Sequence, residues 1–387
     1  TREAQERGFR RTFETPIDVG GRFSALTPFG LLPMALAGID VEAIVASAAD
    51  MAADCAPEIP DSQNPALMLG LVLASLRDSG RDKLTLIASP GLAALPLWIE
   101  QLVAESTGKH GTGIIPVTHE SVEDVGAYGP DRVFVHIVLD GEQDTAIDSR
   151  LGALAEDGHP VLRISLPQPE AIGGEFLRWE IATAIAGALL GVNPFDEPDV
   201  TASKLITREI LDQSPDGAMP DSGEPAAASD SLEVYVDDQR AWAGSLRADT
   251  ARQLIGSFVE LAGPGEYIGV LAFLAGTPER NELLAELRAG LRARTGVATT
   301  AGYGPRYLHS SGQLHKGGPN TGLYLLLTSD AAVDIPIPET TDGFAVLQRA
   351  QALGDERALL ERDRRVLRVN LGWYVEEGLE ALVEALT

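Results

Sequence analysis

Residues 83–89 read Lys-Leu-Thr-Leu-Ile-Ala-Ser, and residues 98–109 read Trp-Ile-Glu-Gln-Leu-Val-Ala-Glu-Ser-Thr-Gly-Lys. The first run is short and apolar and predicts a buried strand over Lys83–Ser89. In the second, apolar residues recur at helical spacing and predict an amphipathic helix that ends near Lys109. A strand followed by a helix is the repeating unit of α/β proteins, so this stretch indicates the fold class.

The same alternation continues along the chain. Further strands are expected at 114–117, 132–139, 161–166, 232–236, 267–273, 322–328 and 366–371. Helices are expected at 41–53, 64–78, 144–156, 174–190, 199–212, 248–261, 278–295, 344–363 and 373–386. This pattern predicts an α/β chain with a mainly parallel sheet covered by helices on both faces.

The segment 214–231 is rich in Pro, Gly, Ala, Ser and Asp and has few large apolar residues. Such composition is typical of linkers, so we predict domains at 1–213 and 232–387 joined by the linker 214–231. Within the second domain, 303–321 is a long polar stretch with basic residues, which predicts a functional loop for an anionic ligand.

Composition excludes several classes of partner. The 387 residues carry a formal net charge of −27, which disfavours nucleic acid and anionic membrane surfaces. The single cysteine, Cys55, excludes an intrachain disulfide and zinc sites of the two-cysteine type. The longest apolar runs are too short to span a bilayer and no secretory signal opens the chain, so we expect a cytoplasmic protein.

Glu105 is the first candidate for chemistry. It lies in the last turn of the predicted helix, where the negative end of the helix dipole raises the pKa of a carboxyl group toward the range of a general base. Gln101 lies one turn earlier on the same face, and Gly108 is expected to end the helix in a left-handed turn. On its own, a Glu at a helix end is most often a solvated surface residue.

Three other segments carry candidate groups. Gly20 and Gly21 precede Arg22, and we expect these glycines to use backbone angles closed to other residues and to let a ligand or the arginine approach the backbone. Lys204 lies on the helix after an Asn-Pro-Phe-Asp turn, and His309 lies in the 303–321 loop. Each residue alone is also consistent with a plain turn or a solvated side chain.

A carboxylate, an arginine, a lysine and a histidine together suit an aldose–ketose isomerase. A base moves a proton between two adjacent carbons, a cation stabilises the enediolate, and a His and a Lys relay the protons of ring opening. A non-catalytic phosphosugar-binding or assembly module would use similar residues without the proton transfer. Neither a metal nor an organic cofactor is called for.

The sequence resembles the phosphoglucose isomerase family, built on the sugar-isomerase (SIS) fold, which implies a three-layer αβα domain. The matching motifs are Val19-Gly20-Gly21-Arg22-Phe23-Ser24, Gln101 through Glu105-Ser106-Thr107-Gly108-Lys109, Gly191-Val192-Asn193-Pro194-Phe195-Asp196 with Lys204, and His309-Ser310-Ser311-Gly312-Gln313.

The resemblance implies interconversion of glucose 6-phosphate and fructose 6-phosphate through a cis-enediol. Glu105 would be the base, Arg22 would stabilise the enediolate, and Lys204 and His309 would assist ring opening. The resemblance also implies substrate contacts for Gly20, Gly21, Gln101, Gln313 and His315. A homodimer is implied, because the family's ring-opening histidine reaches the site from the neighbouring subunit.

This chain departs from the family pattern in three ways. The His motif follows Lys204 instead of preceding it, which is similar to the isomerase half of bifunctional transaldolase/phosphoglucose isomerase fusions, and His315 is a rival to His309. Glu197 stands where the family often has Gln. The first SIS subdomain with its phosphate loop is absent, so we expect the C-terminal portion of a longer enzyme, with upstream SIS and perhaps transaldolase domains, and weak binding of glucose 6-phosphate by this portion alone.

Overall fold

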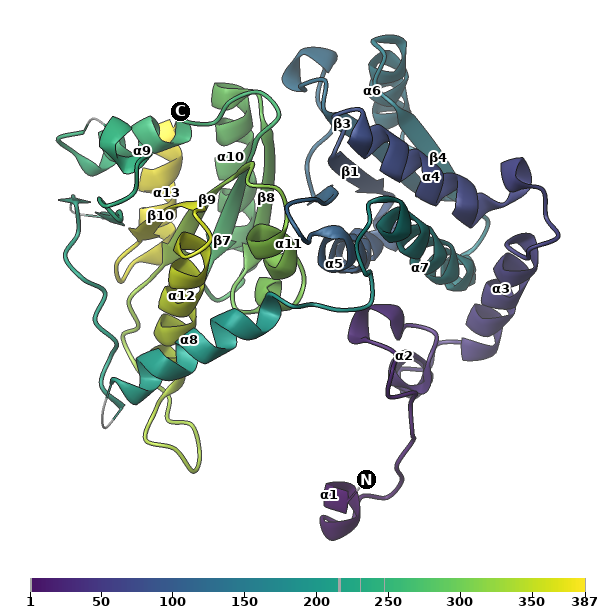
Figure 1. Cartoon of the computed structure of the whole chain (residues 1–387), viewed down its shortest axis with the longest axis horizontal. Coiled ribbons are helices and arrows are strands. Elements are labelled where there is room, and N and C mark those ends of the chain that lie inside the picture. The colour runs from purple at the N-terminus through teal and green to yellow at the C-terminus, as the bar shows by residue number, and fades with distance from the viewer. Residues whose placement is uncertain (1, 215–216, 230, 247, 387) are drawn as a thin grey trace.

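Two sheets form the framework of the protein (Figure 1). The computed structural model describes residues 2–214, 217–229, 231–246 and 248–386. The first sheet has the order β2-β1-β3-β4 with parallel pairs throughout, built from β1 (Lys83–Ala88), β2 (Ile115–Thr118), β3 (Arg132–Leu139) and β4 (Val161–Leu166). The predicted α/β class with mainly parallel sheets is confirmed.

The first sheet is covered on both faces. Alternate residues of β3 point to opposite sides, so Val133 and Val135 join a core with α4, α5 and α7, while Phe134 packs toward α6. The helices of this first unit are α1 (Arg2–Glu6), α2 (Pro28–Leu36), α3 (Val41–Asp54), α4 (Pro65–Asp78), α5 (Leu95–Thr107), α6 (Thr145–Glu156) and α7 (Ile172–Leu189). Among them, α1 stands away from the rest of the chain (Figure 1).

The second sheet has the order β5-β6-β10-β9-β7-β8, in which β10, β9, β7 and β8 are parallel and β5 and β6 are antiparallel. Its strands are β5 (Ala227–Ala228), β6 (Glu233–Tyr235), β7 (Tyr267–Ala272), β8 (Ala298–Tyr303), β9 (Gly322–Thr328) and β10 (Arg365–Asn370). The helices around it are α8 (Val200–Asp212), α9 (Ala251–Val259), α10 (Pro278–Thr295), α11 (Gly312–Gly317), α12 (Phe344–Leu360) and α13 (Val375–Leu386).

Two sequence expectations for this second unit need correction. The stretch 303–321 is not one long loop, because the 3-10 helix η8 (Arg306–His309) and α11 lie within it. Strand β8 was not expected, since its sequence Ala-Thr-Thr-Ala-Gly-Tyr has no run of large apolar residues. Its place at the edge beside the buried strand β7 holds it in the sheet.

Helix α8 packs on the second unit although it precedes the predicted linker (Figure 1). It lies along α12, where a Cβ on Gly354 would meet the Thr207 hydroxyl at 2.6 Å, so glycine permits the close approach. Residues 215, 216 and 230 of the predicted linker lie outside the described residues, and β5 already forms within the rest of it. The domain boundaries therefore stay a prediction.

The two units share a hydrophobic core. Ala104 of α5 and Ile115 and Val117 of β2 pack in one cluster with Tyr267 and Leu271 of β7. No helix among the residues described is long and apolar enough to cross a membrane.

The partly buried Glu180 of α7 is expected to make the stability of the protein depend on pH. Burial raises the pKa of its carboxyl group to about 8, and Oε1 has no hydrogen-bond partner in the described part of the chain. The folded state therefore keeps a proton that the unfolded state releases from about pH 4.5 upward, so the free energy of unfolding falls as the pH rises through that window to about pH 8. We expect Glu180→Gln to stabilise the protein by roughly 2–4 kcal/mol at pH 8.5, because one pKa unit corresponds to about 1.4 kcal/mol.

Urea unfolding at pH 5 and pH 8.5 measures this effect. The exposed Glu58→Gln is the matched control and is expected to leave the pH dependence as it is in the wild type. A Glu180→Gln protein that loses stability with pH as steeply as the wild type would contradict the assignment.

Candidate functional site

The C-terminal turn of α5 holds a buried acid and arginine pair. Glu105 is 7% exposed and Arg22, from the 3-10 helix η1 (Gly21–Phe23), is 3% exposed. Arg22 Nη1 lies 3.5 Å from Glu105 Oε1, and the Gln101 side chain donates a hydrogen bond of 3.3 Å to Glu105 Oε2. The structure thus brings together three of the residues that the sequence singled out.

The remaining nitrogens of Arg22 are held by the turn at 193–197 and by α5. Nε donates to Ser106 Oγ at 2.9 Å, and Nη2 donates to the carbonyl oxygens of Pro194 and Asp196 at 2.7 and 2.9 Å. Nη1 also contacts Glu197 Oε2 at 3.0 Å. Each of the three nitrogens has a partner, so the guanidinium is fixed and offers a rigid positive charge beside Glu105.

The pKa of Glu105 is raised, in the direction expected from the sequence. The largest cause is burial of the carboxyl group, which Arg22 and Gln101 oppose, whereas Glu197 adds to the rise. The main cause is thus the low-dielectric surroundings of the buried carboxyl group.

Lys109 completes this cluster, although no role was predicted for it from the sequence. Its side chain is 1% exposed, and Nζ lies 2.9 Å from Asp196 Oδ1 and also donates to the carbonyl oxygen of Asn193. Burial lowers the pKa of Lys109, while Asp196 raises it. Its position at the end of the Glu-Ser-Thr-Gly-Lys motif was the sequence feature that could have indicated a role for Lys109.

The glycines act differently from the expectation. Neither Gly20 nor Gly21 has a positive φ, and a Cβ on Gly21 would meet no heavy atom within 4 Å, so the backbone there faces open space. Gly108 ends α5 as expected, but with φ −78° instead of a left-handed angle. A Cβ on Gly108 would lie 2.5 Å from Leu314 Cα, so this glycine is needed for the close approach of α11.

Lys204 and His309 form a second pair. Both are exposed, on α8 and at the end of η8. The pKa of His309 is lowered first by the partial burial of its imidazole ring and then by the charge of Lys204. In the described structure no hydrogen bond or ion pair joins this pair to Glu105 or Arg22.

Gln313 lies between the Arg22–Glu105 pair and the segment of Lys204, and it contacts the backbone on both sides. It is 0% exposed, and its Nε2 donates to Gly108 O at 3.0 Å and to Asp199 Oδ2 at 2.8 Å, while its Oε1 accepts from Asp199 N at 2.8 Å. This side chain links α11 to the end of α5 and the start of α8. It is not placed where a substrate could touch it.

His315 is also buried, at 3% exposure, between Tyr307 and Tyr324. Burial lowers the pKa of His315 to about 3, and within the residues described its Nδ1 has no hydrogen-bond partner. A buried His315 does not fit the predicted contact with a substrate. The local polar motif gave no sign of this burial, so the sequence prediction missed it.

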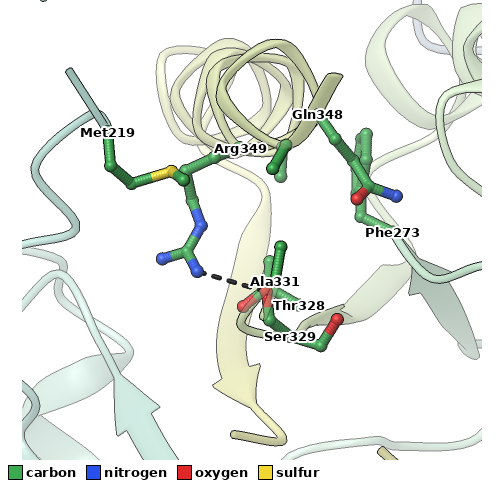
Figure 2. A pocket seen from close by; sticks show the side chains of 9 residues that line it. Met219, Phe273, Thr328, Ser329, Ala331, Gln348 and Arg349 are labelled. Carbon is green, nitrogen blue, oxygen red and sulfur yellow. Dashed lines mark hydrogen bonds between the residues drawn. The ribbon is translucent and has the colours of Figure 1, made fainter. Parts of the chain in front are cut away.

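Figure 2 shows a hollow elsewhere, at the end of β9. Met219, Ser329 and Arg349 line it, and Arg349 donates to the Ser329 carbonyl at 3.2 Å. Its volume of about 20 Å³ has room for about one water molecule. Across the described ranges, no group of three or more His, Cys, Asp or Glu residues could hold a metal ion.

No known family profile matches the chain. Among curated proteins, the glucose-6-phosphate isomerase of Rubrobacter xylanophilus is 34% identical over 237 residues, which cover 51% of this chain and 54% of that protein. The corresponding proteins of Parabacteroides distasonis and Symbiobacterium thermophilum are 32% and 35% identical, each over 54% of this chain and over 55% and 54% of those proteins. About half of this chain is similar to glucose-6-phosphate isomerases.

The chain also spans about half the length of these curated relatives. Among solved structures, a glucose-6-phosphate isomerase from Chlamydia trachomatis is 12% identical with a TM-score of 0.26, over 88% of this chain and 71% of that chain.

Glu197 gives a prediction about the electrostatics of this site. Its charge raises the pKa of Glu105 and occupies Arg22 Nη1. Glu197→Gln is therefore expected to lower the pKa of Glu105, because it removes a like charge from its surroundings. A ¹³C NMR titration of the glutamate side chains measures the change, with the exposed Glu224→Gln as the control. An unchanged or higher pKa of Glu105 would show that Glu197 does not act on it.

Proposed function

We propose that this chain takes part in the interconversion of glucose 6-phosphate and fructose 6-phosphate. The observation that carries the proposal is the buried Arg22–Glu105 pair, with Nη1 and Oε1 3.5 Å apart and the pKa of Glu105 raised. A carboxylate with a raised pKa near a fixed guanidinium suits a reaction that moves a proton between carbons and forms an enediolate. The names of the similar curated proteins favour this function over a binding module.

The proton transfer needs only groups of this cluster. The Glu105 carboxylate removes the proton from C2 of the open-chain aldose, and the electrons shift to the carbonyl oxygen to give the cis-enediolate. The hydroxyl proton on O2 passes to the negative O1, Glu105 returns its proton to C1, and the oxygen on C2 becomes the ketone oxygen. Arg22 stabilises the negative oxygen through its fixed charge, since its nitrogens are already held by protein partners.

Ring opening is assigned to Lys204 and His309. Both are exposed, and the charge of Lys204 contributes to the lowered pKa of His309. This shift favours a neutral imidazole that can accept a proton near neutral pH. The exposure of His309 favours it over the buried His315. Gln101, the backbone of Gly20 and the open backbone at Gly21 would contact the sugar, whereas the buried Gln313 links the surrounding helices.

The wider context belongs to the same proposal. The order of the motifs, with His309 after Lys204, supports a rearranged isomerase of the kind fused to transaldolase. The homodimer and the cytoplasmic location remain expectations that light scattering and cell fractionation would test.

Arg22→Lys tests the role of the guanidinium. Lysine keeps the charge but cannot hold Ser106, the turn and Glu197 at once, so the charge loses its fixed place. We expect kcat to fall by about 10²–10³, measured in a coupled assay that oxidises the glucose 6-phosphate formed from fructose 6-phosphate. Arg77→Lys, far along the chain on α4, is the control and should keep the wild-type rate. Full activity of the Arg22→Lys protein would remove Arg22 from the proposed mechanism.

A further inference from the structure

A cavity of about 450 Å³ opens where the two units meet. It lies at the carboxyl ends of β2 and β8, marked by Thr118 and Tyr303, with α10 as a side wall and Leu97 of α5 at its edge. Ligands of α/β proteins bind at such strand ends, and cavities of about 300–1,000 Å³ hold small molecules. None of Arg22, Glu105, Lys204 and His309 lines this cavity.

Arg288 provides a buried positive charge in its wall. The residue is 7% exposed, and its guanidinium donates to three backbone carbonyl oxygens, those of Thr118 at 2.9 Å, His119 at 3.2 Å and Thr299 at 2.7 Å. These acceptors are neutral, so they hold the group in place without cancelling its charge. Arg288 Nε has no hydrogen-bond partner among the residues described.

Arg306 of η8 adds a second guanidinium, which is exposed and, within the described ranges, makes no hydrogen bond or ion pair. The negative charge of one carboxylate, that of Glu100, interacts electrostatically with both arginines. Glu100 is 9% exposed and accepts a hydrogen bond of 2.9 Å from Thr118 Oγ1. Glu120 also acts on Arg288, but it is already paired with Arg132 and Arg292. A positive excess thus remains in a chain whose net charge is −27.

The other walls are apolar or carry neutral polar groups. Leu97, Leu284 and Ala301 provide apolar surface, and the Tyr303 hydroxyl donates to Asn281 Oδ1 at 2.7 Å. A cavity with a few convergent polar groups and apolar walls is typical of metabolite sites.

We propose that this cavity is a binding site for a small anionic metabolite, whose phosphate or carboxylate group lies against Arg306 and Arg288. Its body fills the space between α5 and α10. The site is separate from the isomerase cluster, so it does not depend on the proposed function.

The test uses the full chain and two probes, inorganic phosphate and acetate, in titrations followed by calorimetry and by amide NMR shifts. We expect saturable binding of at least one probe, with shifts at Thr118, Tyr303 and Arg306. Arg306→Gln should weaken binding at least about tenfold, since a hydrogen bond to a charged group is worth that much or more. Ala285→Trp, an exposed cavity-lining position, should block the site without changing charge.

Two controls separate this site from the isomerase cluster. Arg11→Gln removes the same charge from the exposed N-terminal segment and should bind like the wild type. Glu105→Gln should also bind like the wild type, whatever its activity. The proposal is overturned if neither probe saturates, if Arg306→Gln and Ala285→Trp both bind as the wild type does, or if Lys204→Met alone abolishes binding.

Discussion

Replacing Glu105 by Gln is expected to lower the isomerase rate by at least about 10³-fold, because the amide cannot accept the proton that the carboxylate removes from carbon. The shape of the side chain is kept, and Gln101 and Arg22 still face it. Arg22 retains Glu197, Ser106 and the turn carbonyls as partners, so the loss of one carboxylate does not leave a bare buried cation. The coupled assay measures the rate, and the melting temperature measures the fold.

The control for this substitution is Glu156→Gln, an exposed residue at the end of α6. It is expected to leave both rate and melting temperature as in the wild type. A Glu105→Gln protein that keeps its fold and more than a tenth of the wild-type rate would exclude Glu105 as the base. Loss of the melting transition would instead show that the pair is needed for folding.

Replacing Asp355 by Ala is expected to destabilise the protein by about 3–5 kcal/mol, the range for breaking a buried ion pair. Asp355 is 0% exposed and accepts hydrogen bonds from Lys316 Nζ at 2.7 Å, Ser203 Oγ at 3.1 Å and the Tyr307 hydroxyl at 2.5 Å. Without the carboxylate, the buried Lys316 ammonium has no ion-pair partner among the residues described. These partners come from α11, α8 and η8, so the substitution loosens three elements.

The functional consequence follows from the same contacts. Ser203 precedes Lys204 and Tyr307 lies two residues before His309, so Asp355 holds both segments of the proposed ring-opening pair. Urea unfolding measures the stability, and Asp124→Ala, whose side chain is 96% exposed, is the control, expected to change it by less than about 0.5 kcal/mol. A change below about 1 kcal/mol for Asp355→Ala would contradict the account of this network.

The sequence predicted helices and strands well where regularly spaced apolar residues marked them. The run Lys83–Ser89 and the helix carrying Glu105 were evident from apolar spacing, and Arg22, Gln101 and Glu105 do come together. Strand β8 and helix α11 were missed, because small and polar residues are held there by neighbours distant in the sequence.

Properties that depend on tertiary burial could not be predicted. His315 and Gln313 stand in a polar motif that looks accessible, yet both are packed inside the molecule. The packing of α8 on α12, the role of Lys109 and the cavity beside Arg288 also arise from contacts between remote segments. Sequence periodicity reports which face of an element is buried, but not which element covers it.

In the proposed reaction, Glu105 moves a proton between C1 and C2 of a hexose 6-phosphate. The most direct measurement is ¹H NMR of fructose 6-phosphate turned over by this chain in heavy water. We expect deuterium to enter at C1 with the wild type and not with Glu105→Gln. Repeated turnover with no deuterium at C1, or equal uptake by both proteins, would contradict it.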